Sequence, residues 1–196
     1  MIIHTLNALI RKMRLVISFL INKRKYKEWH LRSQIINPFR IRPQFISVGD
    51  NVLVLDFARI EGITHFNDRF FTPQIELCDG VSIQQGIHLT CAESVRIGKN
   101  TAIAAYVTIT DIHHPYTDIN IPIEQQNIEV QPVSIGENCK IYNGAVILPG
   151  VCIGNHVTIG ANSVVTHDIP DYSVAVGNPA KVIKRFDFEQ KRWIKV

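Results

Sequence analysis

The sequence predicts an all-β fold in which short strands wind into a prism. The first observation is a period of six, because an aliphatic residue recurs at every sixth position between residues 135 and 165. The members of this series are Ile135, Ile141, Ile147, Ile153, Ile159 and Val165. A helix would return an apolar side chain after three or four positions and an isolated strand after two. A period of six therefore indicates a short unit that is stacked many times.

The second and third observations concern the positions between those aliphatic residues. The fourth position of each unit is also restricted, to Cys139, Ala145, Val151, Val157, Ser163 and Ile169. Each unit then holds one short strand, such as 157–159, whose first and third side chains share a face. The other residues must turn a corner, and Gly-x-Asn fills this corner at 136–138 and 160–162. Gly and Asn tolerate left-handed backbone angles, so strand and corner are expected to alternate.

This repeat resembles that of the hexapeptide-repeat family, with an aliphatic residue followed by glycine and a small residue in phase. The resemblance implies a left-handed parallel β-helix. The left hand comes from the resemblance alone, because crossovers between parallel strands are usually right-handed.

Composition bounds the class of protein. Hydrophobic residues make up 46% of the 196 residues and charged residues 19%, which is typical of a globular chain and excludes disorder. The cysteines form no Cys-x-x-Cys pair and are expected to be reduced core thiols: Cys78, Cys91, Cys139 and Cys152. Without a disulfide framework or a signal peptide, the predicted compartment is the cytoplasm.

Residues 1–45 are expected to form a basic, partly helical segment. They carry 10 Lys and Arg residues against one acidic residue, Glu28, whereas the rest of the chain carries 11 basic and 16 acidic residues. Residues 2–21 are mostly apolar, but the basic residues at their centre exclude a membrane span. The apolar residues recur at helical spacing before the basic cluster 23–27, which favours an amphipathic helix. They are Leu6, Ile10, Met13, Ile17, Leu20 and Ile21.

Two partners fit this helix equally well. It can lie on an anionic membrane surface, at the inner face of the membrane, or it can pack on the prism or on a neighbouring subunit. Nucleic acid is not expected, because the basic residues accompany an apolar stripe and no aromatic platform.

The prism itself is expected over residues 46–185. Its repeat begins at Val48, lapses between Asp56 and Pro73, and shifts by two residues near Val95, where a bulge or loosened corner is expected. The repeat vanishes at about 112–131, and a gap of this length predicts an extruded loop of functional importance. Residues 186–196 show helical spacing, and a short helix is expected to cap the prism there.

The strongest candidate for chemistry is the segment 110–115, Thr-Asp-Ile-His-His-Pro, where the coil gives way to the loop. An imidazole with a pKa near 6.5 suits a general base at neutral pH, and such a base contributes typically about 10²–10⁴-fold. Two adjacent histidines also fit a solvated loop, and spacing alone leaves both interpretations open.

Segments 150–154 and 177–183 resemble the C-terminal half of the maltose, galactoside and Nod-factor O-acetyltransferases, and of bacterial capsule and O-antigen acetyltransferases. The resemblance covers residues 75–185. It implies that His114 takes a proton from a sugar hydroxyl, which attacks acetyl-CoA, with His113 as the alternative base and Asp111 orienting the imidazole. It also implies a homotrimer that needs no metal.

The resemblance further implies binding residues. In these relatives acetyl-CoA lies along the prism between adjacent subunits, and the corresponding positions are Asn143, Ala161, Thr166, His167, Lys181 and Lys184. Galactoside-type relatives place an asparagine and an aspartate on the sugar, where this chain has Gln84 and Ala92. The missing carboxylate argues against a simple galactoside or maltose acceptor. The expected lining of a different acceptor pocket is Gln84, Gln85, Glu93 and Tyr106.

Two other functions use the same prism. γ-Type carbonic anhydrases need a His-x-x-x-x-His pair, and none of the 8 histidines stands five positions from another. A non-catalytic trimeric scaffold would need neither the histidine nor the loop. The predicted function is therefore an acetyl-CoA-dependent O-acetyltransferase that modifies a bacterial surface-polysaccharide sugar or its lipid-linked precursor. The metalloenzyme and the scaffold are the alternatives.

Overall fold

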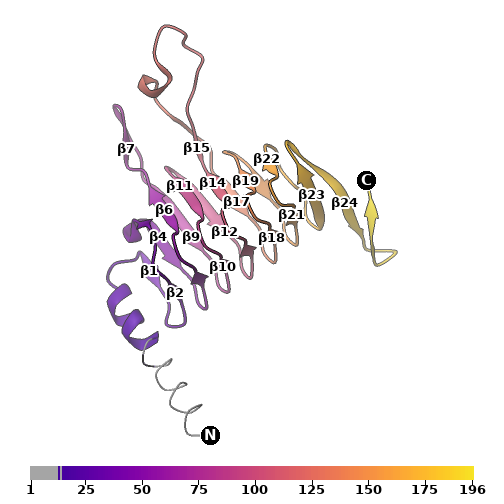
Figure 1. Cartoon of the computed structure of the whole chain (residues 1–196), viewed down its shortest axis with the longest axis horizontal. Helices are drawn as coiled ribbons and strands as arrows, with labels where there is room; N and C mark the ends of the chain where they lie inside the picture. The colour runs from indigo at the N-terminus through magenta and orange to yellow at the C-terminus, as the bar shows by residue number, and fades with distance from the viewer. Residues whose placement is uncertain (1–12, 14) are drawn as a thin grey trace, which may run out of the picture.

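The computed structural model describes residues 13 and 15–196. Strands of two to five residues stack in parallel on three walls, and each turn of the chain visits the walls in order (Figure 1). The fold is therefore a parallel β-helix, as the hexad period predicts. Hydrogen bonds within a wall join strands of successive turns, so residues about twenty positions apart become neighbours.

Wall one contains six parallel strands, in the spatial order of the sequence. They are β1 (Glu28–Trp29), β4 (Ile46–Val48), β9 (Gln74–Leu77), β12 (Ser94–Ile97), β17 (Val133–Ile135) and β20 (Cys152–Ile153). Wall three also contains six. They are β3 (Arg40–Ile41), β6 (Arg59–Gly62), β11 (His88–Cys91), β14 (Thr108–Thr110), β19 (Val146–Ile147) and β22 (Val164–Val165).

Wall two is longer, because antiparallel strands extend it at the C-terminal end. Its parallel strands are β2 (Gln34–Ile35), β5 (Leu53–Val54), β10 (Ser82–Ile83), β13 (Ala102–Ile103), β18 (Lys140–Ile141), β21 (Thr158–Ile159) and β23 (Ser173–Gly177). The antiparallel strands β24 (Ala180–Asp187) and β25 (Arg192–Lys195) follow.

The aliphatic hexad residues fill the interior of the prism. Ile141, Ile147 and Ile159 are fully buried, in the single core that all three walls share. The corners use the predicted residues: Asn138 and Asn162 have φ of 57° and 56°, in the left-handed region that asparagine tolerates. The hexad pattern therefore specified both the strands and the corners of this part correctly.

The first turn of the prism begins earlier than predicted. Strands β1, β2 and β3 pair in parallel with β4, β5 and β6, so residues 28–41 belong to the prism and not to a separate N-terminal segment. The sequence placed the boundary between the N-terminal segment and the prism at residue 45 because residues 1–45 are basic. The basic side chains in the first turn instead point outward from the prism. Arg32 pairs with Asp50, and Arg40 pairs with Glu61.

The predicted N-terminal helix is present where the structure describes it, over residues 15–22. Phe19 packs against the core, whereas the four described members of the predicted apolar stripe are exposed. Those members are Met13, Ile17, Leu20 and Ile21, and Leu6 and Ile10 lie outside the described residues. These four side chains are thus not covered by the prism of their own chain. Within the described part of the chain, no helix is long and apolar enough to span a membrane.

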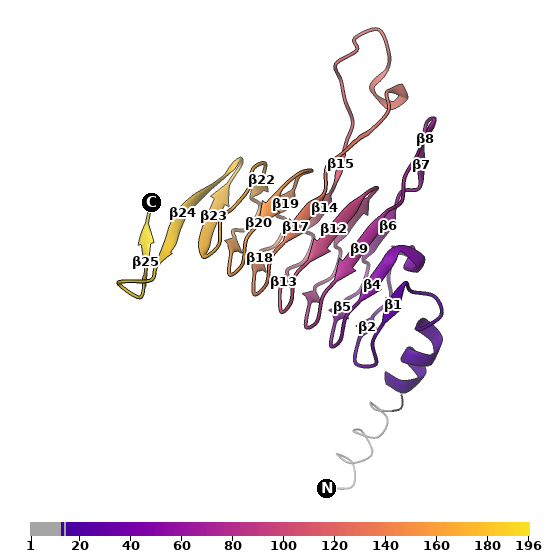
Figure 2. The same ribbon diagram turned by 180° about the vertical axis from the view of Figure 1, so that it is seen from behind.

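The C-terminal helix predicted at 186–196 is wrong, because β24 and β25 form an antiparallel hairpin there (Figure 2). The carboxylate of Asp187 accepts hydrogen bonds from the N–H groups of Glu189 and Gln190, both at 2.9 Å, and this contact closes the turn. Phe186 then lies opposite Trp193, with ring centroids 5.6 Å apart. The apolar spacing that suggested a helix is thus the spacing of a tight hairpin.

The cysteines match the prediction in three of four cases. Cys78, Cys91 and Cys139 are buried and free, but Cys152 is free and exposed, since its side chain points outward from β20. Burial raises the pKa of Cys78 to about 11 and raises that of Cys91 further, so both are protonated thiols at neutral pH.

Candidate active site

Three successive turns of the prism depart from the hexad at one edge, between wall three and wall one. After β6 the chain leaves in a hairpin of β7 (His65–Phe66) and β8 (Arg69–Phe70). After β11 the corner at 92–93 carries the predicted two-residue shift. After β14 the chain leaves in the predicted long loop, whose stem pairs β15 (Ile112–His113) with β16 (Glu129–Val130). The lapse predicted from Asp56 is thus confined to the hairpin, because β6 is a regular strand.

Both excursions project from the prism on the same side (Figures 1 and 2). The side-chain N–H of Asn67 donates to the carbonyls of Glu124 and Gln126 at 3.3 and 3.2 Å. Arg69 donates to the carbonyl of Ile128 at 3.4 Å. The hairpin therefore holds the loop near its base. The loop contains one 3₁₀ helix, η2 (Ile123–Gln125), and a second, η1 (Pro43–Phe45), lies between β3 and β4.

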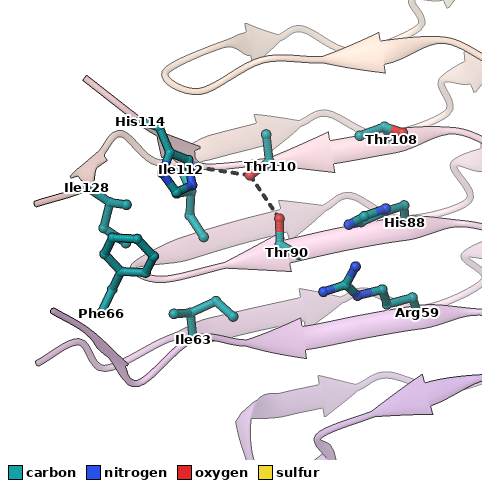
Figure 3. A pocket seen from close by; sticks show the side chains of 10 residues that line it. All are labelled: Arg59, Ile63, Phe66, His88, Thr90, Thr108, Thr110, Ile112, His114 and Ile128. Atoms are coloured by element: carbon teal, nitrogen blue, oxygen red, sulfur yellow. Dashed lines mark hydrogen bonds between the residues drawn. The ribbon is translucent and has the colours of Figure 1, made fainter. Parts of the chain in front are cut away.

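A pocket of about 380 Å³ opens between the excursions and the outer face of wall three. Its floor comes from β6, β11 and β14, and its sides come from the hairpin and the loop (Figure 3). The lining residues are Arg59, Ile63, Phe66, His88, Thr90, Thr108, Thr110, Ile112, His114 and Ile128. One end is polar and lies on the strands, and the other is apolar and lies beneath the loop.

His114 stands at the apolar end. Its ring meets the edge of Phe66, with centroids 5.2 Å apart. Its Nδ1 atom is buried without a hydrogen-bond partner among the described residues, and the nearest carboxylate oxygen, Oε1 of Glu124, lies 3.9 Å away. The Nδ1 side of the ring thus faces the protein, which leaves Nε2 as the nitrogen that can meet a bound hydroxyl.

His113 does not line the pocket. The chain is extended at β15, so neighbouring side chains alternate, and Ile112 and His114 face the pocket while His113 faces away. His113 is exposed and contacts Tyr116 edge-on at 6.0 Å. Of the two adjacent histidines, His114 is therefore the one that lines the pocket.

Asp111 does not have the predicted orienting position beside His114. Its carboxylate is fully buried and accepts hydrogen bonds from the backbone N–H groups of Ala92, Glu93 and Ser94, at 2.8, 2.8 and 2.9 Å. Both oxygens are therefore engaged by the irregular corner of the preceding turn. Asp111 therefore stabilises the corner at residues 92–94. The carboxylate near His114 belongs to Glu124.

The polar end of the pocket follows the register of wall three. Arg59, His88 and Thr108 lie side by side on adjacent strands, and Thr90 and Thr110 form the next row. The Thr90 hydroxyl donates to Oγ1 of Thr110 at 2.9 Å, and that oxygen accepts from the N–H of Ile112 at 3.1 Å. Burial, and secondarily the charge of Arg59, lowers the pKa of His88, which keeps this imidazole neutral at neutral pH.

The predicted acceptor residues lie outside this pocket. Gln84, Gln85 and Tyr106 occupy the edge between wall two and wall three, where the N–H of Tyr106 donates to the carbonyl of Gln85. Glu93 is exposed at the irregular corner, in a separate hollow beside Phe70. The residues that line the pocket instead, Arg59, Phe66 and His88, carry no motif in the sequence. That they lie on one face becomes visible only once successive turns of the prism are aligned.

The predicted coenzyme residues are spread over the C-terminal turns. Asn143 and Ala161 stack at the edge between walls two and three, where the N–H of Asn162 meets the carbonyl of Asn143. Thr166 and His167 lie at the opposite edge of wall three and contact each other at 2.8 Å. Lys181 and Lys184 lie on β24. One chain thus does not gather the six residues at one place.

Metal ligands are not grouped in this structure. Among residues 13 and 15–196, no three His, Cys, Asp or Glu side chains are placed to hold an ion together.

Known proteins are similar to this chain in sequence and in fold. Residues 132–167 match the bacterial transferase hexapeptide family (six repeats). The chain is 39% identical over 135 residues to WbbJ of Escherichia coli (strain K12), which is described as an O-acetyl transferase of lipopolysaccharide biosynthesis, covering 65% of this chain and 69% of that protein. It is 33% identical over 156 residues to the galactoside O-acetyltransferase of the same organism, covering 78% and 70%.

A solved structure extends the similarity to three dimensions. The hexapeptide-repeat acetyltransferase VCA0836 of Vibrio cholerae aligns with a TM-score of 0.56 at 17% identity, over 92% of this chain and 89% of that one. This likeness concerns the fold alone and confirms the left-handed parallel β-helix that the repeat implied. A second structure of VCA0836 is described as a complex with acetyl coenzyme A.

Proposed function

Because the chain belongs to the hexapeptide-repeat O-acetyltransferase family, we propose that it transfers the acetyl group of acetyl-CoA to a sugar hydroxyl bound beside His114. The observation that carries the proposal is the pocket itself. It places one imidazole at the foot of the extruded loop, facing a cavity large enough for a sugar ring. Acetyl-CoA as donor is supported by the complex of VCA0836.

In this mechanism His114 acts as the general base. Its Nε2 accepts the proton of the acceptor hydroxyl while the hydroxyl oxygen bonds to the thioester carbonyl carbon. The carbon–sulfur bond then breaks, the acetyl group stays on the sugar oxygen, and the proton passes to the thiolate of coenzyme A. A proton on Nδ1 is required for Nε2 to act as base. The carboxylate of Glu124 lies 3.9 Å from Nδ1, too far for a hydrogen bond, so it favours this tautomer only through its charge.

We place the coenzyme between two copies of the chain, in a homotrimer. The dispersal of Asn143, Ala161, Thr166, His167, Lys181 and Lys184 over separate edges of one chain supports a slot shared by two subunits. The loop supports this assembly too, because it exposes apolar side chains that a neighbouring copy would cover. Ile119 is 92% exposed, and Tyr116, Ile121 and Ile123 are also exposed.

We further place the acceptor on a bacterial surface saccharide or its lipid-linked precursor. The name of WbbJ supports the saccharide, and the N-terminal helix supports the lipid-linked form. The exposed stripe Met13, Ile17, Leu20 and Ile21 is followed by Lys23, Arg24, Lys25 and Lys27, so apolar and cationic groups meet at one end of the molecule. Anionic headgroups and acyl chains complement both.

The test uses a thiol reagent to detect the coenzyme A that the enzyme releases from acetyl-CoA. A panel of sugars and lipid-linked sugars serves as acceptors. Acceptor-dependent release by the wild-type chain and its loss in His114→Ala are expected. Release that persists in His114→Ala but stops in His113→Ala would contradict the assignment of the base. Sedimentation of the active protein as a monomer would contradict the shared coenzyme slot.

A further inference from the structure

The pocket has a second end that the proposed transfer does not use. Arg59, His88 and Thr108 stand in register across β6, β11 and β14, and all three point to the same face as His114 (Figure 3). No hydrogen bond joins these three side chains to another residue that lines the pocket. Their guanidinium, imidazole and hydroxyl groups are hydrogen-bond donors, and such donors side by side suit an oxyanion.

The charge at this end is positive despite a nearby carboxylate. Glu61 is 2% exposed and pairs with Arg40 on one side and Arg59 on the other. Two guanidinium groups thus share one buried carboxylate, which leaves one positive charge uncompensated. Arg40 does not line the pocket and Arg59 does, so the excess charge is available to a bound ligand at Arg59.

The two ends are separated by the length of a short strand. Thr108 and Ile112 are four residues apart with a bend at Asp111 between β14 and β15, so at about 3.3 Å per residue their separation is at most about 13 Å. This upper limit exceeds the length of one pyranose ring. The hydroxyls of Thr90 and Thr110 lie between the ends, on the floor where a sugar would rest.

We propose that the Arg59 end binds an anionic group, a phosphate or a carboxylate, of the acceptor whose hydroxyl reaches His114. The acceptor class is therefore a glycosyl phosphate or a sugar joined to a uronic acid. This inference rests on the proposed acetyl transfer for the role of His114, but the anion site stands on Arg59, His88 and Thr108. Arg59 is a specificity-determining residue in this proposal, because it contacts the acceptor away from the reacting hydroxyl.

Binding of three probes tests the anion site without requiring acetyl transfer. Glucose 1-phosphate, glucuronate and methyl glucoside are matched in ring and differ in charged group. Ligand-observed NMR of the full chain measures each dissociation constant. We expect at least one anionic probe to bind at least about 10-fold more tightly than methyl glucoside, which corresponds to a charge-assisted contact. Comparison of glucose 1-phosphate with glucuronate shows whether the site prefers a phosphate or a carboxylate.

The variants identify the residue responsible. Arg59→Gln should remove the preference for the anionic probe, and His114→Ala should keep it. Arg96→Gln is the matched control, because Arg96 also pairs with a glutamate, Glu76 at 3.1 Å, but lies on wall one. Arg59→Lys keeps a positive charge beside Glu61, so it should fold and retain part of the preference even if Arg59→Gln is unstable.

Two outcomes overturn the proposal. The first is equal affinity for all three probes in the wild-type chain. The second is a preference that survives in a folded Arg59→Gln or Arg59→Lys variant without any decrease. A chain that binds the anionic probe through Arg59 but never releases coenzyme A would instead contradict the proposed transfer and leave the anion site supported.

Discussion

The two edges of wall three are made from the same repeat but are stabilised in different ways. At the edge with wall two, the corners rely on local backbone conformation, through residues such as Tyr106 and Asn162 with positive φ. At the edge with wall one, three turns are held by contacts across the sequence. Asp111 binds residues 92–94, and Asn67 binds carbonyls 57 and 59 residues away. A regular edge builds the prism, and an irregular edge encloses the pocket.

The largest expected effect tests what the irregular edge is for. His114→Ala should lower the rate of acetyl transfer about 10²–10⁴-fold, because a general base is lost, with little change in the melting temperature. His113→Ala removes an adjacent and more exposed imidazole, and it should leave kcat within a few-fold of the wild type. The check is steady-state kinetics beside thermal unfolding. Equal losses in both variants would show that the pocket does not distinguish the two histidines.

The next effect tests how the irregular edge is held. Asp111→Ala leaves three backbone N–H groups without their acceptor in a partly buried corner, so the free energy of unfolding should fall by about 3 kcal/mol. Asp111→Asn keeps one carbonyl acceptor and should lose less. Denaturant unfolding measures both. If Asp111→Asn unfolds like the wild type yet loses catalysis, then Asp111 acts on His114 after all, and the structural interpretation would be wrong.

The regular edge should respond to backbone chemistry instead. Asn162→Ala places a Cβ without a compensating polar group at φ 56°, which costs about 1–2 kcal/mol of stability. Asn162→Gly adopts the same angle without that penalty and should remain within about 1 kcal/mol of the wild type. A larger loss for Gly than for Ala would show that side-chain contacts, and not backbone conformation, stabilise this edge.

A smaller effect concerns the contact between the two excursions. Asn67→Ala removes two partly exposed hydrogen bonds to the loop, each worth about 0.5–1.5 kcal/mol. Amide exchange at 111–131 should accelerate while exchange in β18 and β21 is unchanged. Acceleration spread evenly over the prism would mean that the loop and the coil open as one unit. That result would contradict the distinction between the regular and the irregular edge.

The smallest effect is a dependence on pH at the floor of the pocket. The pKa of His88 is lowered by burial, so the unfolded chain binds its proton more tightly than the folded chain does. The contribution of His88 is fully present above the unfolded pKa near 6.5 and is lost as pH falls through the folded value. His88→Asn should therefore lose less stability between pH 7 and pH 5. An identical loss in both proteins would contradict the lowered pKa of this partly buried ring.

The sequence by itself determined the repeating architecture and the position of the loop that carries His114. Each hexad contains its own strand and corner, so the interior residues Ile135–Val165 and the asparagine corners follow from local rules. The interruption of the hexads likewise located the loop and His114. Boundaries were less secure. Because residues 32 and 40 are basic, the first turn of the prism was assigned to the N-terminal segment. The turn at Asp187 was assigned to a helix.

The tertiary structure decided which residues meet. Arg59, His88 and Thr108 are separated by 29 and 20 positions, and their register depends on how many residues each turn uses at the irregular edge. The hairpin, the two-residue shift and the loop change that number in successive turns, and no local pattern states by how much. Asp111 shows the same limit, because a carboxylate beside a histidine in sequence points instead to the corner of the preceding turn. Local backbone preferences fix the coil, whereas contacts between its turns fix the pocket.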